Sequence, residues 1–308
     1  MITVIGSLNM DLVINTPRLP KPGETIMGRK FKQVPGGKGA NQAAAIARLG
    51  ADVQMIGCIG EDQMGQVLKQ TLEKDGVNTK HIFEKKDSST GVAAILVEEF
   101  GNNMITVAPG ANYALSVDDI KDKKAVIQDT DIVLLQLETT MDVVETALTL
   151  AKEAGKKTIL NPAPAWSLRR AVLKNIDVLT PNETELETLT GGRIDTEQKL
   201  IDASRVLIKN GVGEIVVTLG EKGCVHVTKD TAKRFHAYNV KSVDATAAGD
   251  SFNGALAVCL ERGDCMDAAI EYAMKVGAMT VTKEGAQTSL PYKKEVDAFT
   301  EWLKKGEE

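Results

Sequence analysis

The sequence predicts an α/β protein with a doubly wound, mostly parallel sheet, flanked by helices and accompanied by a small β-sheet lid. Three observations support this class. Short β-rich runs alternate with longer helical patterns, which is typical of βαβ units. Most of the β-rich runs are continuously apolar, as strands covered on both faces are. Two segments near the N-terminus lack a crossover helix and contain glycine and proline.

The alternating elements are expected in a regular order along the chain. Strands of the large sheet are expected at residues 2–5, 53–58, 131–137, 157–160, 178–180 and 215–219. Helical periodicity and helix-end signals predict helices at residues 40–49, 64–74, 141–153, 197–209, 251–261 and 266–282. We therefore expect one domain over residues 1–308, with a lid formed by insertions at about 12–35 and 90–109. A closing lid would exclude water from a transfer reaction. The alternative is an ordinary hairpin extension.

Composition excludes several functional classes. The chain is 43% hydrophobic and 26% charged, with a formal net charge of −5, which disfavours nucleic acid as a partner. No apolar run approaches the length of a membrane span, and no export signal precedes one, so we expect no membrane partner. The cysteines are scattered and show no disulfide or zinc spacing, which favours a cytoplasmic location. The histidines His81, His226 and His236 are also dispersed, and we assign no chemistry to them.

The most informative stretch is the small-residue turn at residues 244–254. Ala247, Ala248 and Gly249 leave backbone N–H groups unobstructed, and the positive end of the following helix favours an anion such as phosphate. Asp250 would repel phosphate, but it could take a proton from a hydroxyl that attacks phosphorus. The pattern therefore predicts a kinase. The alternative is that Asp250 only caps a helix.

A second glycine-rich turn leads into an alanine-rich helix at residues 35–45. It matches neither the Walker A spacing nor the dinucleotide-binding glycine pattern. Gly37 and Gly39 permit close approach, while Lys38 and Asn41 offer hydrogen-bond donors, a combination suited to a polyhydroxylated ligand. Asn9 and Asp11 follow the first predicted strand, at the edge where ligands bind in α/β sheets, although both residue types are also common in turns.

Together, residues 36–65 and 244–255 resemble the paired signatures of the ribokinase-type carbohydrate kinase family, and the resemblance extends over essentially the whole chain. Further similar stretches are residues 6–11, 136–138, 161–165 and 180–185. The resemblance implies ATP-dependent phosphorylation of D-ribose at its 5-hydroxyl, with Asp250 as general base and Ala247 to Gly249 as the anion hole. The implied sugar-binding positions are Asn9, Asp11, Gly37, Lys38, Gly39, Asn41 and Glu138. Met10 lies between two of them, where its thioether could tilt selectivity toward a 2-deoxy sugar.

The resemblance also implies nucleotide-binding positions. They are Thr218, Gly220, Lys222 and Gly223 in a loop after a strand, Gly249, and the pair Asn182 and Glu185, which would organise Mg²⁺ and phosphate through water. Mg²⁺ is expected independently, because triphosphate oxygens need a divalent cation during transfer. The alternative for Asn182 and Glu185 is a helix cap with its first-turn acid. Met274 replaces a polar residue that relatives often carry near the nucleotide, so a contact there would be apolar or absent.

Finally, the resemblance implies a K⁺ site beside the anion hole and a homodimer formed through the lid. The implied K⁺ positions are Asp244, Thr246, Thr280, Lys283, Gly285 and Ser289. Three alternatives remain open: a sibling kinase acting on 2-deoxyribose, another pentose or a nucleoside; a sugar-binding regulator without activity; and a nucleotide-dependent oxidoreductase, whose glycine fingerprint is absent.

Overall fold

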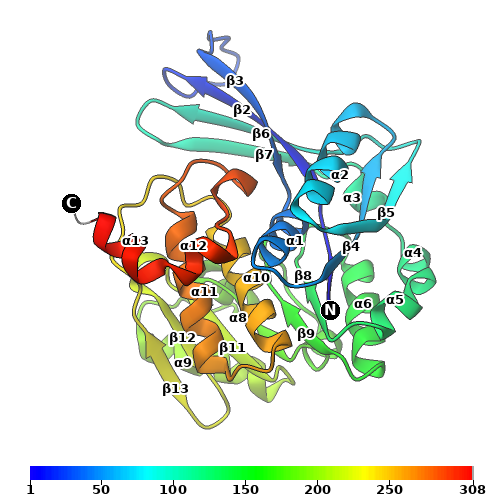
Figure 1. Cartoon of the computed structure of the whole chain (residues 1–308), viewed down its shortest axis with the longest axis vertical. Coiled ribbons are helices and arrows are strands. Elements are labelled where there is room, and N and C mark those ends of the chain that lie inside the picture. Colours follow the sequence, from blue (N-terminus) through cyan, green and yellow to red (C-terminus); the bar gives the residue numbers. More distant parts are fainter. Residues whose placement is uncertain (307–308) are drawn as a thin grey trace.

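The computed structural model of the chain describes residues 1–306 and contains a large sheet and a small one. The large sheet has the order β13-β12-β11-β10-β9-β8-β1-β4-β5 (Figure 1). Its neighbouring strands are parallel except at the β11–β12 and β12–β13 pairs. The strands are β1 (Ile2–Ile5), β4 (Val53–Gly60), β5 (Asn78–Lys85), β8 (Ile132–Leu135), β9 (Lys157–Leu160), β10 (Val178–Leu179), β11 (Glu214–Thr218), β12 (Cys224–Val227) and β13 (Ala232–Phe235).

Helices cover both faces of this sheet. On one face lie α1 (Lys38–Arg48), α2 (Gln63–Asp75), α10 (Ala248–Glu261) and α11 (Met266–Thr280). On the other lie α4 (Val117–Asp122), α5 (Lys124–Gln128), α6 (Met141–Glu153), α7 (Arg170–Leu173), α8 (Glu183–Thr190) and α9 (Glu197–Lys209). Alternation along each strand divides the core between the faces: Val4 packs with the first helix group and Ile5 with the second. The chain also forms α3 (Ala111–Ala114), α12 (Lys293–Asp297) and α13 (Phe299–Gly306).

The predicted fold class is confirmed, and the differences lie at particular elements. All six predicted strands and all six predicted helices are present, and the helices at 141–153 and 197–209 have the predicted ends. Strands β5, β12 and β13 of the large sheet were not predicted from the sequence. Helix α10 begins at Ala248, three residues before the predicted start, because the small residues of the turn already form its first turn. His226 lies in β12 and contacts Glu214 at 2.8 Å, as a structural histidine does.

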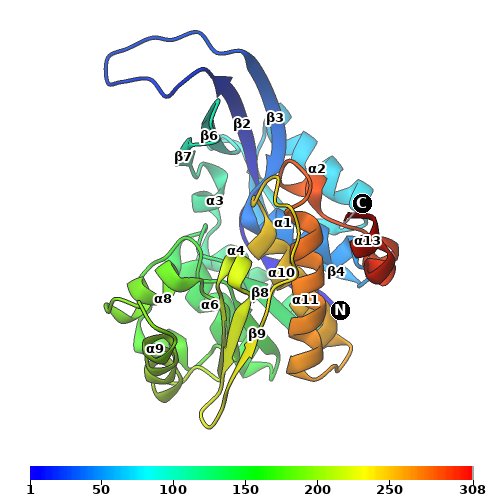
Figure 2. The ribbon, with the colours of Figure 1, turned by 90° about the vertical axis from the view of Figure 1, so that its left-hand side faces the viewer.

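The small sheet contains β3 (Lys30–Gly36), β2 (Asn9–Thr16), β6 (Gly91–Glu98) and β7 (Asn103–Ala108), in that order. These strands come from the two segments predicted as insertions, but β2 begins at Asn9 rather than near residue 12. The sheet projects from the main body in Figure 1, and Figure 2 shows the long connection between β2 and β3 at its far end. Asn9 pairs with both Gly36 and Gly91, so the base of the small sheet meets the edge of the large one.

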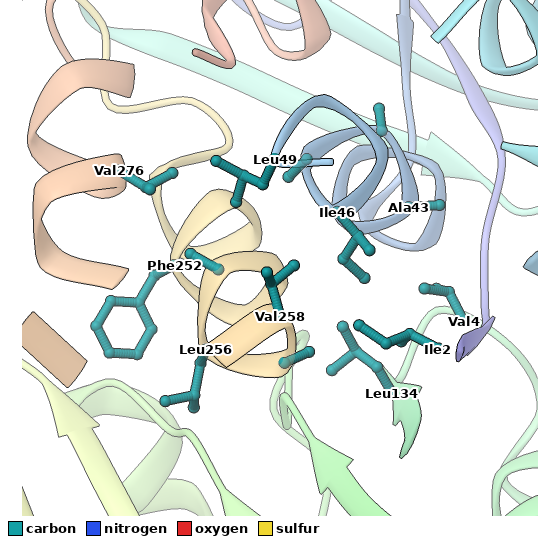
Figure 3. Packing of buried hydrophobic residues seen from close by; sticks show 14 of the residues in the cluster. Ile2, Val4, Ala43, Ile46, Leu49, Leu134, Phe252, Leu256, Val258 and Val276 are labelled. Atoms are coloured by element: carbon teal, nitrogen blue, oxygen red, sulfur yellow. The ribbon is translucent and has the colours of Figure 1, made fainter. Parts of the chain in front are cut away.

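Two packing features fix the position of the site. The chain runs outward from β1 in one direction to β4 and β5 and in the other to β8, β9 and β10, so the strand order reverses beside β1, where ligands bind in such sheets. Helices α1 and α10 pack together above β1 and β8, with Ile46 and Val258 among the contacting side chains (Figure 3). Gly254 permits this approach, because a Cβ there would lie 2.9 Å from that of Ala45. Among residues 1–306, no helix combines the length and apolar character that crossing a bilayer requires.

Candidate active site

Asp250 lies in the first turn of α10, and its side chain is buried, with 6% of its surface exposed. Asn41 Nδ2 donates to Asp250 Oδ2 at 2.9 Å, and Gln42 Nε2 donates to Oδ1 at 3.1 Å. Both donors come from the N-terminal half of α1. The N-cap position of α10 is Ala247, and no side chain caps the helix. The capping alternative for Asp250 is therefore wrong, since its carboxylate is directed to α1 instead.

The turn before Asp250 is strained and open. Ala247 has a φ of 61°, and no other residue except glycine has a positive φ in the part of the chain that the structure describes. Such a conformation costs about 1 to 3 kcal/mol in a non-glycine residue. At Gly249, no heavy atom outside its chain neighbours and its own helix backbone lies within 4 Å of the position that a Cβ would occupy. The turn thus leaves free space at a helix N-terminus, where backbone N–H groups and the helix dipole favour an anion.

A cavity of about 120 Å³ lies between the base of the small sheet and the edge of the large one. Asn9 and Glu138 line it together with residues that the sequence analysis did not single out: Val107, Pro109, Asn112, Tyr113, Leu137 and Pro164. Asn9 and Asp11 lie on the same face of β2, since alternate residues of a strand share a face. They therefore belong to the small sheet, not to the end of β1 as the sequence analysis expected. Met10 packs in the hydrophobic core and is 1% exposed, so its side chain does not enter the cavity.

Three glycines allow the polar groups to converge. A Cβ at Gly36 would lie 2.4 Å from Asp11 Oδ2. Gly37 has a φ of 89°, and a Cβ there would lie 2.6 Å from the backbone nitrogen of Asn9. A Cβ at Gly39 would lie 2.6 Å from the backbone nitrogen of Ser7. The glycine-rich turn is thus pressed against the chain between β1 and β2, which brings Lys38 near enough to Asp11 for their charges to interact.

Several charged groups share this region and shift one another's ionisation. Burial raises the pKa of Asp11 to about 7, and the neighbouring Glu138 and Asp250 add to the effect while Lys38 opposes it. Burial lowers the pKa of Lys38, but the surrounding carboxylates, Asp250 and Glu138 first, more than offset this, so the net shift is upward. Burial also raises the pKa of Glu185. One ammonium group therefore balances several carboxylates, and an added cation or a hydrogen-bond donor would relieve their repulsion.

Two side chains orient the groups that line the cavity, and the sequence analysis assigned no role to either. Asn112 Nδ2 donates to Asn9 Oδ1 at 2.8 Å, while Asn112 Oδ1 accepts from the backbone N–H of Leu8. The amide nitrogen of Asn9 is thereby left to face a ligand. Ser7 Oγ and the backbone N–H of Lys38 both donate to Glu138 Oε2, which leaves Oε1 to accept other bonds. Nothing in the sequence around Asn112 marks it, because it is brought to Asn9 only by the fold.

The predicted nucleotide positions lie at the ends of β10 and β11. Asn182 and Thr218 form an isolated parallel bridge, so these two are adjacent. Asn182 and Glu185 form a reciprocal capping box at the start of α8, so the helix-cap interpretation is confirmed, while their contact with Mg²⁺ stays a prediction. Gly220 has open space around its Cβ position, whereas a Cβ at Gly223 would lie 2.0 Å from the carbonyl oxygen of Phe235. Glycine is thus required at 223 both by this close packing and by a φ of 92°.

Two further predicted nucleotide positions are Lys222, which lines a cavity, and Met274, which is buried. Lys222 lines a separate cavity of about 320 Å³ beside α8 and α9. Met274 packs in the core, with its sulfur 3.7 Å from Cys224 Sγ. In the structure, Met274 therefore contributes to core packing.

The predicted K⁺ positions lie on two loops that Asp244 joins. Its carboxylate accepts from the backbone and hydroxyl of Thr246 and from the backbone N–H of Gly285. Burial alone would raise the pKa of Asp244, but these bonds lower it. Thr280 Oγ1 donates to Ser251 Oγ in α10, so the second loop begins against the strained turn. The side chains of Lys283 and Ser289 are engaged elsewhere, with Glu295 and the carbonyl of Ala286.

These features define a class of protein: a sheet edge at which a buried carboxylate directly follows an open helix N-terminus suited to phosphate and lies near polar side chains suited to a sugar. Comparison with known proteins agrees. A model of the pfkB family of carbohydrate kinases matches residues 1–293. The chain belongs to this family, whose members are ATP-dependent sugar kinases.

Several individual proteins resemble the chain over nearly its whole length. It is 42% identical to a ribokinase of Haemophilus influenzae over 97% of this chain and 98% of that protein. It is 38% identical to a deoxyribokinase of Salmonella typhi over 98% of each. Among solved structures, Arabidopsis thaliana ribokinase complexed with ribose and ATP has a TM-score of 0.90 and 31% identity, with 97% of each chain covered.

Proposed function

We propose that the protein phosphorylates D-ribose at its 5-hydroxyl with ATP, giving ribose 5-phosphate. One observation carries the proposal: Asp250 is buried, is held by two amide donors, directly follows the open turn at Gly249, and interacts electrostatically with Asp11 and Lys38 near the cavity. The resemblance to ribokinases at 37% to 42% identity, one from Haemophilus influenzae and one from Staphylococcus aureus, supports the choice of sugar.

Asp250 acts as the general base. A carboxylate that accepts from two amides keeps lone pairs free, and one of these takes the proton of the attacking hydroxyl. The backbone N–H groups at Ala247 and Gly249 then meet the negative charge of the transferring phosphoryl group. Because the strained φ of Ala247 is already fixed by the fold, these donors need no rearrangement during the reaction. The N–H of Ala248, the third predicted member of the anion hole, instead donates to the carbonyl of Ala245 at 3.2 Å within the turn.

Side chains that line the cavity or lie near it provide both acceptors and donors for a sugar. Asp11 and the free Oε1 of Glu138 accept from hydroxyl groups, while the amide nitrogen of Asn9 and the ammonium of Lys38 donate. Asn41 was expected to donate a hydrogen bond to the sugar, but its amide nitrogen already donates to Asp250. Its Oδ1 is buried without a hydrogen-bond partner among the described residues, and a sugar hydroxyl would satisfy it.

ATP extends from Gly249 along the ends of β10 and β11, past Asn182, Thr218 and Gly220, and Mg²⁺ offsets the charge of its phosphates when bound. The residues fit such an ion. Glu185 is half-buried, forms no salt bridge with the described residues, and has a raised pKa that a nearby cation would reverse. The capping box fixes the orientation of its carboxylate, so Glu185 would hold ordered water toward the ion.

K⁺ would fit the loops joined by Asp244, because they hold an ionised carboxylate next to the strained turn. The cation would hold the turn in place, so we expect its effect on turnover rather than on folding. Replacing K⁺ by choline at constant ionic strength should lower kcat severalfold while the thermal midpoint changes little. Unchanged turnover would contradict the K⁺ assignment.

The direct test is an ATP-consumption assay with D-ribose, 2-deoxyribose, other pentoses and nucleosides. The proposal predicts the highest kcat/KM for D-ribose. The second candidate, phosphorylation of 2-deoxyribose, is favoured by the similarity to the Salmonella typhi deoxyribokinase, and a higher kcat/KM for 2-deoxyribose would establish it. A preference for nucleosides would contradict both candidates.

We further propose a homodimer formed through the small sheet, which would act as the lid. Large apolar side chains are exposed on its outer strands, namely Phe31, Met104, Ile105 and Val107. Pairing with a second copy would cover them. Light scattering of the wild type and of Ile105→Asp should give dimer and monomer masses, respectively; a monomeric wild type would contradict this assembly. A cytoplasmic location is supported by Cys265, an exposed free thiol that a reducing compartment preserves.

A further inference from the structure

A buried network of amide side chains is hydrogen-bonded to Asp250 on the side of the large sheet. Gln136 Nε2 donates to Gln42 Oε1 at 2.6 Å. Gln42 Nε2 in turn donates to Asp250 Oδ1 at 3.1 Å and to Asn161 Oδ1 at 3.2 Å. Gln42 and Gln136 are fully buried, and Asn161 is 6% exposed. Buried polar groups are costly unless they are paired, so this arrangement calls for an explanation.

The hydrogen bonds of this network fix which end of the Gln42 amide faces Asp250. Because Gln136 donates to the oxygen of the Gln42 amide, the nitrogen of that amide must face Asp250 and Asn161. Asn161 supports the same orientation, since its oxygen accepts while its nitrogen donates toward the carbonyl of Thr180 at 3.4 Å. Gln136 and Asn161 follow β8 and β9, so two adjacent strands of the large sheet fix the amide. Gln42 therefore presents a donor, and never an acceptor, to Asp250.

We propose that Gln42 is a positioning residue for the proposed base: oriented by Gln136 and Asn161, it holds the carboxylate of Asp250 in the rotamer that faces the sugar. The inference rests on the proposed function, because it requires Asp250 to be the base. Asn41 binds the other carboxylate oxygen, so the two donors together prevent rotation of the carboxylate. Donors to an ionised carboxylate stabilise that form over the protonated one.

Other charged groups near Asp250 must be separated from this effect. Lys38 of α1, Asp11 of β2 and Glu185 of α8 interact electrostatically with it, and Glu138 lies next to Lys38 and Asp11. Among these, Asp11 titrates near neutral pH, and it contacts the sugar, so its protonation would appear in KM. The acid limb of kcat, measured with saturating sugar and MgATP, is therefore the appropriate readout for Gln42.

The test compares Gln42→Met, which removes the donor at similar volume, with Gln54→Met. Gln54 is also buried, and its Nε2 donates to Thr3 Oγ1 at 3.0 Å near the amino end of the sheet, far from the site. For Gln42→Met we expect kcat to fall about 10- to 100-fold and the acid limb to move up by about one pH unit, with the ribose dissociation constant within about threefold of wild type. Gln54→Met should lower the thermal midpoint but leave kcat and the acid limb unchanged.

A second variant keeps the test decisive if Gln42→Met does not fold. Gln42→Glu retains the size and the bond from Gln136 but turns an acceptor toward Asp250, so its acid limb should move further upward than that of Gln42→Met. A wild-type acid limb in either folded variant would overturn the inference. So would a loss of kcat that follows the thermal midpoint, as in a merely structural role.

The Asp250→Asn background distinguishes the inference from the proposed function. If Asp250 is the base, that variant has little activity, and adding Gln42→Met should lower the residual rate by less than about twofold, because the two residues act together. A further tenfold loss would overturn the positioning role while leaving the base assignment intact. If Asp250→Asn alone retains near-normal turnover, the base assignment fails, and the role of Gln42 fails with it.

Discussion

Asp11 offers a prediction whose size follows from the structure. Its pKa is raised from 3.8 to about 7, first by burial and then by Glu138 and Asp250. Each pH unit corresponds to about 1.4 kcal/mol, so ionising Asp11 costs the folded state about 4 kcal/mol relative to the unfolded chain. The sign follows from the raised pKa: the stability is fully present below pH 3.8 and is lost as the pH rises through about 7. About 3 kcal/mol of the loss falls between pH 5 and pH 8.5.

The substitution Asp11→Asn removes this pH-dependent loss of stability, because the Asn side chain does not titrate. The gain in free energy of unfolding over wild type should be about 3 kcal/mol larger at pH 8.5 than at pH 5, as measured by urea denaturation. Asp62→Asn is a matched control. Asp62 caps α2 and its pKa is lowered by bonds from Thr90 and Gly65 despite burial, so its stabilisation is lost only as the pH falls toward that lowered pKa. Its difference from wild type should stay constant between the two pH values.

The same group should couple sugar binding to proton release. A sugar hydroxyl donates to ionised Asp11, so binding at pH 7 should release about half a proton. Calorimetry of ribose binding in two buffers with different ionisation enthalpies measures this number. A stability difference for Asp11→Asn that is equal at both pH values, together with no buffer dependence of binding, would refute the electrostatic description of this site.

Two further substitutions test the geometry of the sugar cavity. Gly36→Ala would place a Cβ 2.4 Å from Asp11 Oδ2, so we expect the carboxylate to move and KM for the sugar to rise at least tenfold; an unchanged KM would show that Asp11 does not contact the sugar. Asn112→Leu removes the bond that orients Asn9, so steady-state kinetics should show KM raised about tenfold and kcat nearly kept, because this bond is distant from the transferred proton. A loss in kcat alone would contradict that role.

Much of the fold follows from the sequence because its signals are local. Continuously apolar runs such as residues 157–160 specify buried parallel strands, and the helix at 141–153 has a clear amphipathic period. Strand β5 was missed because its buried and exposed positions do not alternate regularly, and β12 and β13 were missed because they form a short antiparallel extension. The start of α10 was placed late because Gly249 and Asp250 have low helix propensity and favour turns.

The site could be predicted only in part, for a different physical reason. Glycine-rich turns and the acid at Asp250 are visible because their chemistry needs particular residue types at close spacing. The partners of these residues are not visible, since Asn112 reaches Asn9, and Gln136 reaches Gln42, only through the topology of the two sheets. The carboxyl-edge rule would have indicated Gln136 and Asn161, which follow β8 and β9. The burial of Met10 in the core could be predicted only by knowing that β2 begins at Asn9.

The central claim is that Asp250 removes the proton from the sugar hydroxyl during phosphoryl transfer. Single-turnover phosphorylation of D-ribose by Asp250→Asn, alongside calorimetric ribose binding, tests it most directly. The account predicts a rate about 10² to 10⁴ times lower than wild type with ribose affinity largely kept. Transfer at a near-normal rate by the folded variant would contradict it.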